Sequence, residues 1–157
     1  GGALLDLGVY TLNFASMVFG DRVATLSSTV QMMDTGVDQQ ESITITYENG
    51  EMAVLCASAT CAGDRRGVVY GSTGTLEVDN INNPSVITVT PFGKPGEART
   101  YPAPAQITGF EYEVQAALDG IMNGKVECEA MPHAETVRVL QMMDDLRAQW
   151  GLVYPCE

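Results

Sequence analysis

One segment of the 157-residue sequence constrains the fold more than any other. In SITITYENGEMAVLCASAT, two runs of alternating apolar and polar residues meet at Asn49-Gly50. Alternation with period two predicts β-strands, and Asn-Gly readily supplies the positive φ angles of a two-residue type I′ turn. We therefore predict an antiparallel hairpin that turns at these two residues.

A two-residue loop at this position also predicts the register of the hairpin. The opposed pairs would be Glu48 and Glu51, Tyr47 and Met52, Ile45 and Val54, and Ile43 and Cys56. These pairs place most of the apolar side chains on one face. Thr44 and Thr46 would lie on the other face with Ala53 and Leu55. Such a mixed face is typical of a sheet surface that a partner covers.

Helical periodicity, β-branched runs and turn residues predict the remaining elements. They are a helix over Leu4–Phe19, a strand over Arg22–Met33, strands over Gly67–Tyr70, Thr75–Val78 and Val86–Val89, an irregular or edge-running connection over Pro91–Pro104, and helices over Phe110–Met122 and from Pro132 to Trp150. The expected buried side of the last helix carries Val139, Leu140, Met143, Leu146 and Trp150. This order predicts an α+β fold: a largely antiparallel open β-sheet with helices packed on one face and the other face available for oligomerisation.

Charge and composition exclude several classes of partner. The chain has 20 acidic and 8 basic residues and a net charge of −12, which disfavours nucleic acid and anionic membranes. It has no apolar run of about 18 residues and no signal segment, so we expect a cytoplasmic protein. A single histidine and the absence of paired cysteine motifs predict no metal site. The cysteines, expected to be reduced and mostly core filler, are Cys56, Cys61, Cys128 and Cys156.

The first predicted helix carries the strongest candidate site. Asp6, Tyr10 and Asn13 have the spacing of one helical face, and Gly8 leaves room for a ligand beside them. A carboxylate and a phenol on one face can hydrogen-bond a polyol and move its proton. Spacing alone leaves another interpretation open, in which Asp6 is a first-turn acid favoured by the helix dipole and Tyr10 is a packing residue.

A second candidate is the pair Arg65-Arg66, which follows Gly63-Asp64. Two guanidinium groups could bind an acidic substrate or a nucleotide phosphate. The alternative is a solvated ion-pairing site in a loop that leads into a strand.

Four segments together resemble a known family. GGALLDLGVYTLNFA resembles the G-G-x-x-x-D-x-G-x-H/Y motif that opens the C-terminal domain of Gfo/Idh/MocA oxidoreductases. Val69–Glu77, Phe110–Gly124, and Met131–Thr136 with Trp150–Pro155 resemble later segments of the dihydrodiol-dehydrogenase-like branch, in the same order. The resemblance covers nearly the whole chain.

The resemblance implies a longer two-domain enzyme, of which residues 1–157 form the single C-terminal domain for substrate binding and oligomerisation. Tyr10 takes the position of the catalytic His or Tyr, and Asp6 that of the acid that binds a substrate hydroxyl. NAD or NADP would be bound mainly by an N-terminal Rossmann domain, and no G-x-G-x-x-G motif or E-K-P segment with the family's lysine is found here. A phenol becomes a base near neutral pH only beside a positive charge, which that lysine and the oxidised nicotinamide would supply. We therefore expect the chain alone to be inactive.

The sequence thus favours the substrate-side domain of an NAD(P)-dependent oxidoreductase that transfers a hydride between nicotinamide and a sugar, polyol or diol. Its partners would be a small-molecule substrate and further copies of itself, as a homodimer or higher homo-oligomer joined through the sheet. The alternative is a non-catalytic oligomerisation or ligand-binding module that uses the exposed sheet face. A scaffold has no physical need for both Asp6 and Tyr10, so the enzyme is the preferred interpretation.

Overall fold

The computed structural model describes residues 1–154, which form two compact units. The first unit consists of residues 1–62 and the chain from residue 134 onward, and the second of residues 63–133. The first contains the π-helical turn η1 (Leu4–Gly8), helix α1 (Val9–Phe19), strands β1 (Val23–Met32), β2 (Asp38–Tyr47) and β3 (Met52–Ser58), and nearly all of helix α3 (His133–Trp150). The second contains β4 (Gly67–Gly71), β5 (Gly74–Val78), β6 (Val86–Pro91), the 3₁₀ turn η2 (Pro95–Glu97), β7 (Arg99–Pro102) and helix α2 (Phe110–Met122).

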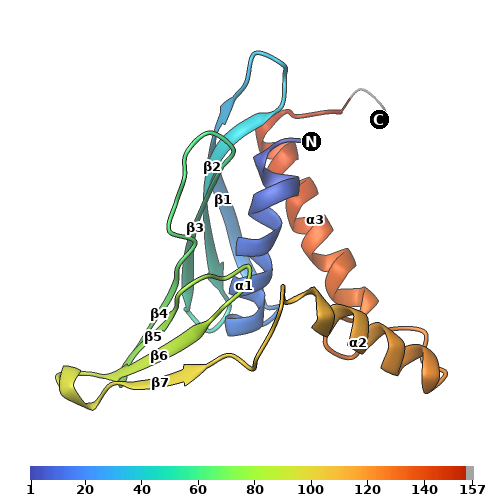
Figure 1. Ribbon diagram of the computed structural model, residues 1–157. Helices are drawn as coiled ribbons and strands as arrows, with labels where there is room; N and C mark the ends of the chain where they lie inside the picture. The colour runs from blue at the N-terminus through green and yellow to red at the C-terminus, as the bar shows by residue number, and fades with distance from the viewer. Residues whose placement is uncertain (155–157) are drawn as a thin grey trace. The chain divides into compact units, whose positions relative to one another are not determined.

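In the first unit, α1 and α3 cover one face of the antiparallel sheet β1-β2-β3 (Figure 1). The core lies between these two layers. Its fully buried side chains come from η1, α1, β2 and α3, and they are Leu4, Leu12, Ile43, Ile45 and Leu146. The predicted alternation of β2 is therefore confirmed, since Ile43, Ile45 and Tyr47 all point into this core.

The predicted hairpin β2–β3 is confirmed, but the predicted pairing of its two strands differs from the observed pairing by one residue. Ile45 pairs with Ala53 and Ile43 with Leu55, because the loop has three residues, Glu48 to Gly50. The Tyr47 N–H donates to the Glu51 carbonyl at 2.9 Å, and the Gly50 N–H donates back to Tyr47. Gly50 has φ +95°, whereas Asn49 does not adopt the left-handed region that a type I′ turn requires. The turn is therefore closed by one left-handed glycine.

The shifted register exchanges the two faces of β3. Ala53 is buried and Leu55 is half-buried on the core side, whereas Met52 and Val54 are 61% and 67% exposed beside the threonines of β2. A one-residue slip moves every side chain of a strand to the opposite face. The uncovered face of this sheet thus combines threonine, serine and glutamine side chains with an apolar column on β3.

The second unit holds the antiparallel sheet β4-β5-β6-β7, which confirms the three short strands that the sequence predicts. The proline-rich connection contains η2 and the edge strand β7. At the start of α2, the Glu111 carboxylate accepts hydrogen bonds from the Thr108 and Gly109 N–H groups. The α+β class with open antiparallel sheets is confirmed.

Two expectations about burial, those for Leu140 and for the cysteines, are wrong. Leu140 of α3 is 48% exposed, because Met142 rather than Leu140 completes the buried side of this helix. Cys56 and Cys61 are exposed free thiols and Cys128 is half-buried, so these side chains do not fill the core. Cys156 lies outside the described residues.

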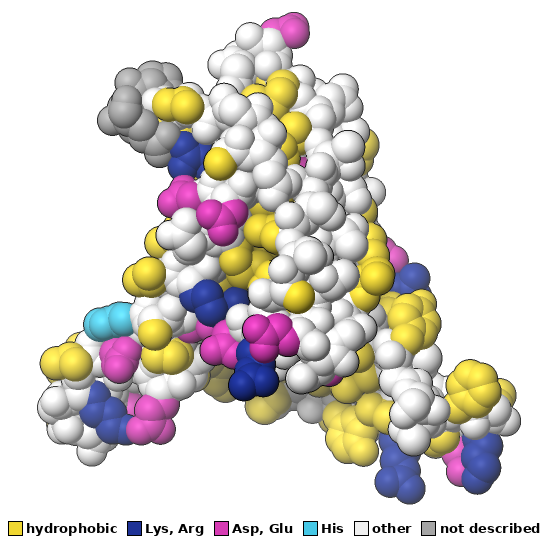
Figure 2. Space-filling model, turned by 180° about the vertical axis from the view of Figure 1, so that it is seen from behind, with side chains coloured by type: hydrophobic (Ala, Val, Ile, Leu, Met, Phe, Trp, Pro, Cys, Tyr) yellow, Lys and Arg dark blue, Asp and Glu magenta, His cyan; other side chains and the backbone are white. Residues whose placement is uncertain are grey.

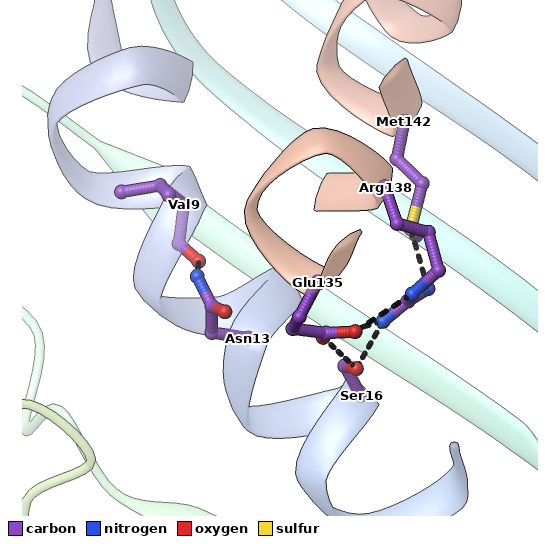
Figure 3. Close-up of polar contacts among 6 residues, drawn as sticks. All are labelled: Val9, Asn13, Ser16, Glu135, Arg138 and Met142. Atoms are coloured by element: carbon purple, nitrogen blue, oxygen red, sulfur yellow. Dashed lines mark hydrogen bonds and ion pairs between the residues drawn. The ribbon is translucent and has the colours of Figure 1, made fainter. Parts of the chain in front are cut away.

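A polar network joins α1 to α3 beside the core (Figure 3). Arg138 makes a bidentate contact with Glu135, with Nε to Oε2 at 3.0 Å and Nη2 to Oε1 at 2.7 Å. Ser16 donates a hydrogen bond to Glu135 and accepts one from Arg138. The pKa of Glu135 is lowered, mainly by its hydrogen bond from Arg138. The network fixes which turns of the two helices lie together.

Two carboxylates of β2 are buried beneath the start of the first helix. Asp38 is 0% and Glu41 is 4% exposed. The Leu4 N–H donates to Asp38 Oδ2 at 2.6 Å, whereas Asp38 Oδ1 and both Glu41 oxygens have no hydrogen-bond partner among the described residues. Burial, followed by the charge of Asp38, raises the pKa of Glu41 from 4.5 to about 7.

The Ser16–Glu135–Arg138 network gives a first prediction. Replacing Glu135 with Gln should lower the free energy of unfolding by about 1–2 kcal/mol, because Arg138 loses a charged acceptor in a partly buried site. Denaturant unfolding would measure this change. Glu129→Gln is the control, since Glu129 pairs with Lys125 on the exposed surface, and it should leave stability unchanged. Equal losses in the two variants would contradict a stabilising role for the network.

Glu41 gives a second prediction, on pH. The unfolded carboxyl loses its proton near pH 4.5, whereas the folded one keeps it to about pH 7. Folding therefore takes up a proton between these values, and stability falls as the pH rises through this window. The shift corresponds to about 3 kcal/mol by pH 8.

The measurement is denaturant unfolding at pH 5 and pH 8 of the wild type, Glu41→Gln, and the exposed-site control Glu51→Gln. Glu41→Gln should lose this part of the pH dependence, and Glu51→Gln should keep it. The same difference between pH 5 and pH 8 in all three proteins would show that Glu41 does not carry it.

Candidate functional site

The candidate site lies on the outward face of the first helix. Leu4, Gly8, Leu12 and Ala15 are buried, which defines the side of η1 and α1 that faces the sheet. A residue two positions after one of these on a helix points roughly away from the sheet, and Asp6 and Tyr10 follow Leu4 and Gly8 by two positions. The spacing of the buried residues therefore places the predicted site residues on the side away from the core.

Asp6 and Tyr10 are both exposed on this outward side, and Tyr10 is 47% exposed. Asp6 lies in the middle of the π-helical turn η1, and Tyr10 is the second residue of α1. Single π turns within helices occur frequently at functional sites. The structure thus places the carboxylate and the phenol on one continuous helix with both side chains open to a partner outside this unit.

Asn13 is half-buried one turn further along α1. Its Nδ2 donates to the Val9 carbonyl at 2.9 Å (Figure 3). The amide nitrogen is therefore engaged with the helix backbone, and a contact with a ligand would fall to the amide oxygen.

Arg65 and Arg66 belong to the second unit, before β4. Arg66 contacts Asp64 and Glu77, each at 3.4 Å, so its guanidinium forms the ion pairs of the structural alternative. Arg65 is exposed and has φ +58°, a left-handed conformation that costs a non-glycine residue conformational energy. The arginines are thus placed in the exposed loop that the sequence predicts, with one of the two already paired.

Two kinds of site can be compared with the described residues, a metal cluster and the pyrophosphate loop of a dinucleotide site. Residues 1–154 contain no group of three or more His, Cys, Asp or Glu side chains that could hold a metal ion. Gly71 ends β4 and Gly74 begins β5, so they flank a turn between two antiparallel strands, whereas a pyrophosphate loop connects a strand to a helix. A hollow of about 460 Å³ against β4, β5 and β6 is lined by apolar side chains, threonines and glycines and contains none of the predicted site residues.

The surface shows no concentrated positive charge on the side that Figure 2 presents, where Lys and Arg side chains are scattered among hydrophobic and acidic ones. None of the helices within residues 1–154 is long and apolar enough to cross a membrane.

Sequence reasoning missed Asp38 and Glu41, the two buried acids beneath the helix. Acidic side chains are seldom fully buried, so their residue type gives no sign of burial here. The available signal was Gly2 and Gly8, because a residue without a Cβ allows a close approach of a neighbouring group. The expectation that Gly8 leaves room for a ligand is wrong, since Gly8 is buried and the space beside it is occupied by Glu41.

Comparison with known proteins agrees with this architecture. The family pattern described as GFO/IDH/MocA C-terminal domain matches residues 1–77. Trans-1,2-dihydrobenzene-1,2-diol dehydrogenase of Danio rerio is 28% identical over 98% of this chain and 48% of its own length. The scyllo-inositol 2-dehydrogenase (NADP(+)) IolU of Bacillus subtilis (strain 168) is 25% identical over 99% of this chain and 46% of its own length. The chain therefore spans about half the length of these relatives.

Solved structures share the fold. A 3-ketoreductase from Actinomadura kijaniata, in complex with TDP-benzene and NADP, superimposes with a TM-score of 0.78 at 23% identity, over 94% of this chain and 46% of that chain. The aldose-aldose oxidoreductase from Caulobacter crescentus gives a TM-score of 0.76 at 18% identity, over 92% and 44% of the two chains. These structures show the shared fold, while the sequence comparisons show that residues 1–77 match the Gfo/Idh/MocA C-terminal domain and that nearly the whole chain is homologous to the C-terminal half of dihydrodiol dehydrogenases.

Proposed function

We propose that the chain is the substrate-side half of an NAD(P)-dependent oxidoreductase that acts on a hydroxyl or carbonyl of a sugar, polyol or diol. The observation that carries this proposal is the outward display of Asp6 and Tyr10 on one helix, on a chain whose relatives are diol and inositol dehydrogenases. A cytoplasmic location is compatible with this activity and forms part of the proposal.

The two side chains have separate roles in the proposed reaction. Asp6, an exposed carboxylate, accepts hydrogen bonds from substrate hydroxyls and orients the ring or chain. Tyr10 takes the proton of the reacting hydroxyl at its Oη during oxidation and returns it during reduction. Because no G-x-G-x-x-G motif occurs in the sequence, the chemistry proposed for this chain is limited to holding the substrate and moving its proton.

Asp6 and Tyr10 would cover only one side of a bound substrate, so the site needs a further domain to cover the other side. The relatives are about twice as long as this chain, and we propose that a dinucleotide-binding domain covers that side and holds NAD or NADP. Such an arrangement would exclude water from the reacting hydroxyl and bring it to the cofactor. It also explains why two polar groups on a bare helix face would have little activity alone.

The uncovered face of β1-β2-β3 supports a proposed contact between copies of the chain. Met52 and Val54 are exposed there beside Thr44 and Thr46, as the corrected register requires. A self-complementary sheet face of this kind suits an isologous dimer. The non-catalytic alternative would use the same face, so the oligomeric state does not discriminate the two functions. The effect of replacing Tyr10 on turnover does discriminate them.

The test of the enzyme is Tyr10→Phe in the full-length protein, assayed with NAD and NADP against diols, inositols and sugars. Loss of the proton carrier should lower kcat by about 100-fold or more, while cofactor binding stays unchanged. Tyr101→Phe is the matched control, since Tyr101 is 52% exposed on β7 and has no assigned role. Unchanged turnover in Tyr10→Phe would remove Tyr10 as the proton carrier.

A separate prediction concerns the cofactor. Residues 1–157 alone should show no micromolar binding of NADPH or NADH by fluorescence titration, because the chain contains no dinucleotide motif. The full-length protein should bind one of them. Micromolar binding to residues 1–157 would place the cofactor site in this chain and contradict the proposed division of roles.

A further inference from the structure

The start of the first helix has no local cap. Ala3 occupies the N-cap position and offers no side-chain hydrogen bond. The Leu4 N–H, one of the donors that a helix start leaves without a partner, instead donates to Asp38 Oδ2 at 2.6 Å. A carboxylate is the favoured acceptor at the positive end of a helix, and this one comes from a strand 34 residues away.

A bulge in β2 brings Asp38 to the same side of the strand as the second buried acid, Glu41. The pairing of β1 with β2 shifts between Gln31 and Met32, which leaves Gln39 as an extra residue on β2. Side chains three positions apart on a regular strand point to opposite faces, whereas a bulge can re-aim one of them. Asp38 and Glu41 therefore both point under the helix, although Glu41 is in phase with the core residues of β2 and Asp38 is not.

The distances at Gly2 and Gly8 show how closely the two carboxylates approach the start of the helix. A Cβ on Gly2 would lie 1.8 Å from Asp38 Oδ1, and a Cβ on Gly8 would lie 2.8 Å from Glu41 Oε1. Gly8 has ordinary helical angles and no positive φ is found at Gly2, so neither needs glycine for its backbone conformation. Their need for glycine arises from the two carboxylates.

The clamped segment is the π turn that presents the site. η1 spans Leu4–Gly8, with Asp38 at its first N–H and Glu41 against its last residue. Asp6 lies in the middle of the turn, and Tyr10 follows two residues after it ends. If η1 relaxed or slid along β2, Asp6 would move relative to Tyr10, because Tyr10 belongs to the regular helix that the core fixes.

We propose that Asp38 and Glu41 are positioning residues, which set the placement of Asp6 relative to Tyr10 by clamping η1 to β2. This inference rests on the proposed function, since Asp6 and Tyr10 are the side chains whose placement it explains. The acids act from the buried side of the turn and touch no substrate.

The first experiment compares Asp38→Ala, Asp38→Asn and Glu135→Gln in the full-length protein. Asp38→Ala should lower kcat by about 10- to 100-fold, the scale of a small misplacement, with cofactor binding unchanged. Asp38→Asn should recover most of this loss, because its amide oxygen still accepts the Leu4 N–H. Glu135→Gln lowers stability elsewhere in the unit and should leave kcat unchanged below its unfolding temperature. Full kcat in a folded Asp38→Ala protein would overturn the positioning role.

The second experiment is independent of activity and uses 3-fluorotyrosine at position 10. Its ¹⁹F resonance should shift or broaden in Asp38→Ala, together with faster amide exchange over Leu4–Gly8, but not in Glu135→Gln. If the wild type turns over no diol or polyol, the proposed function fails, and a changed resonance still supports the clamp. An unchanged resonance and unchanged exchange overturn the clamp whatever the activity.

A third measurement remains informative where a single variant folds poorly. Gly2→Ala should destabilise the wild type but not the Asp38→Ala protein, because the added methyl group then meets no carboxylate. Gly8→Ala should behave in the same way toward Glu41→Ala. Additive effects in both pairs would show that the acids and glycines are not coupled and would overturn the proposal.

Discussion

The hydrogen bond between the buried Asp38 carboxylate and the Leu4 N–H determines how the first helix lies on the sheet. A charged acceptor inside the core is tolerated only when its interactions compensate for lost hydration. Here the helix start supplies both an N–H donor and the positive end of a dipole. The close approach of Asp38 to Gly2 accompanies this contact, and Glu41 makes the corresponding approach at Gly8.

The acidic side chains near the first helix lie on opposite sides of it. Asp38 and Glu41 lie beneath the helix and have no access to a ligand on its outer side, whereas Asp6 lies on the outer side in solvent. The Ser16–Glu135–Arg138 network fixes the other end of α1 against α3. The outward face of the helix, which carries Asp6 and Tyr10, stays exposed to solvent.

Much of the fold could be predicted from local pattern, because period-two alternation, glycine turns and helix stripes act over a few residues. The register of β2 and β3 could not, since Asn49-Gly50 is compatible with both a two-residue and a three-residue loop. The exposure of Asp6 and Tyr10 on one side of the first helix could be predicted, because their spacing is local to that helix. The burial of Asp38 and Glu41 could not, because a bulge and a contact across 34 residues decide where they point.

The central claim is that a helix held on β2 through Asp38 presents Asp6 and Tyr10 to a substrate hydroxyl. The most direct test is a crystal structure of the full-length protein with NADP and a bound diol or polyol. The account predicts a substrate hydroxyl about 2.6–3.2 Å from Tyr10 Oη, a neighbouring hydroxyl on Asp6, and the Leu4 N–H still on Asp38. A substrate bound elsewhere, with both side chains left in solvent, would contradict it.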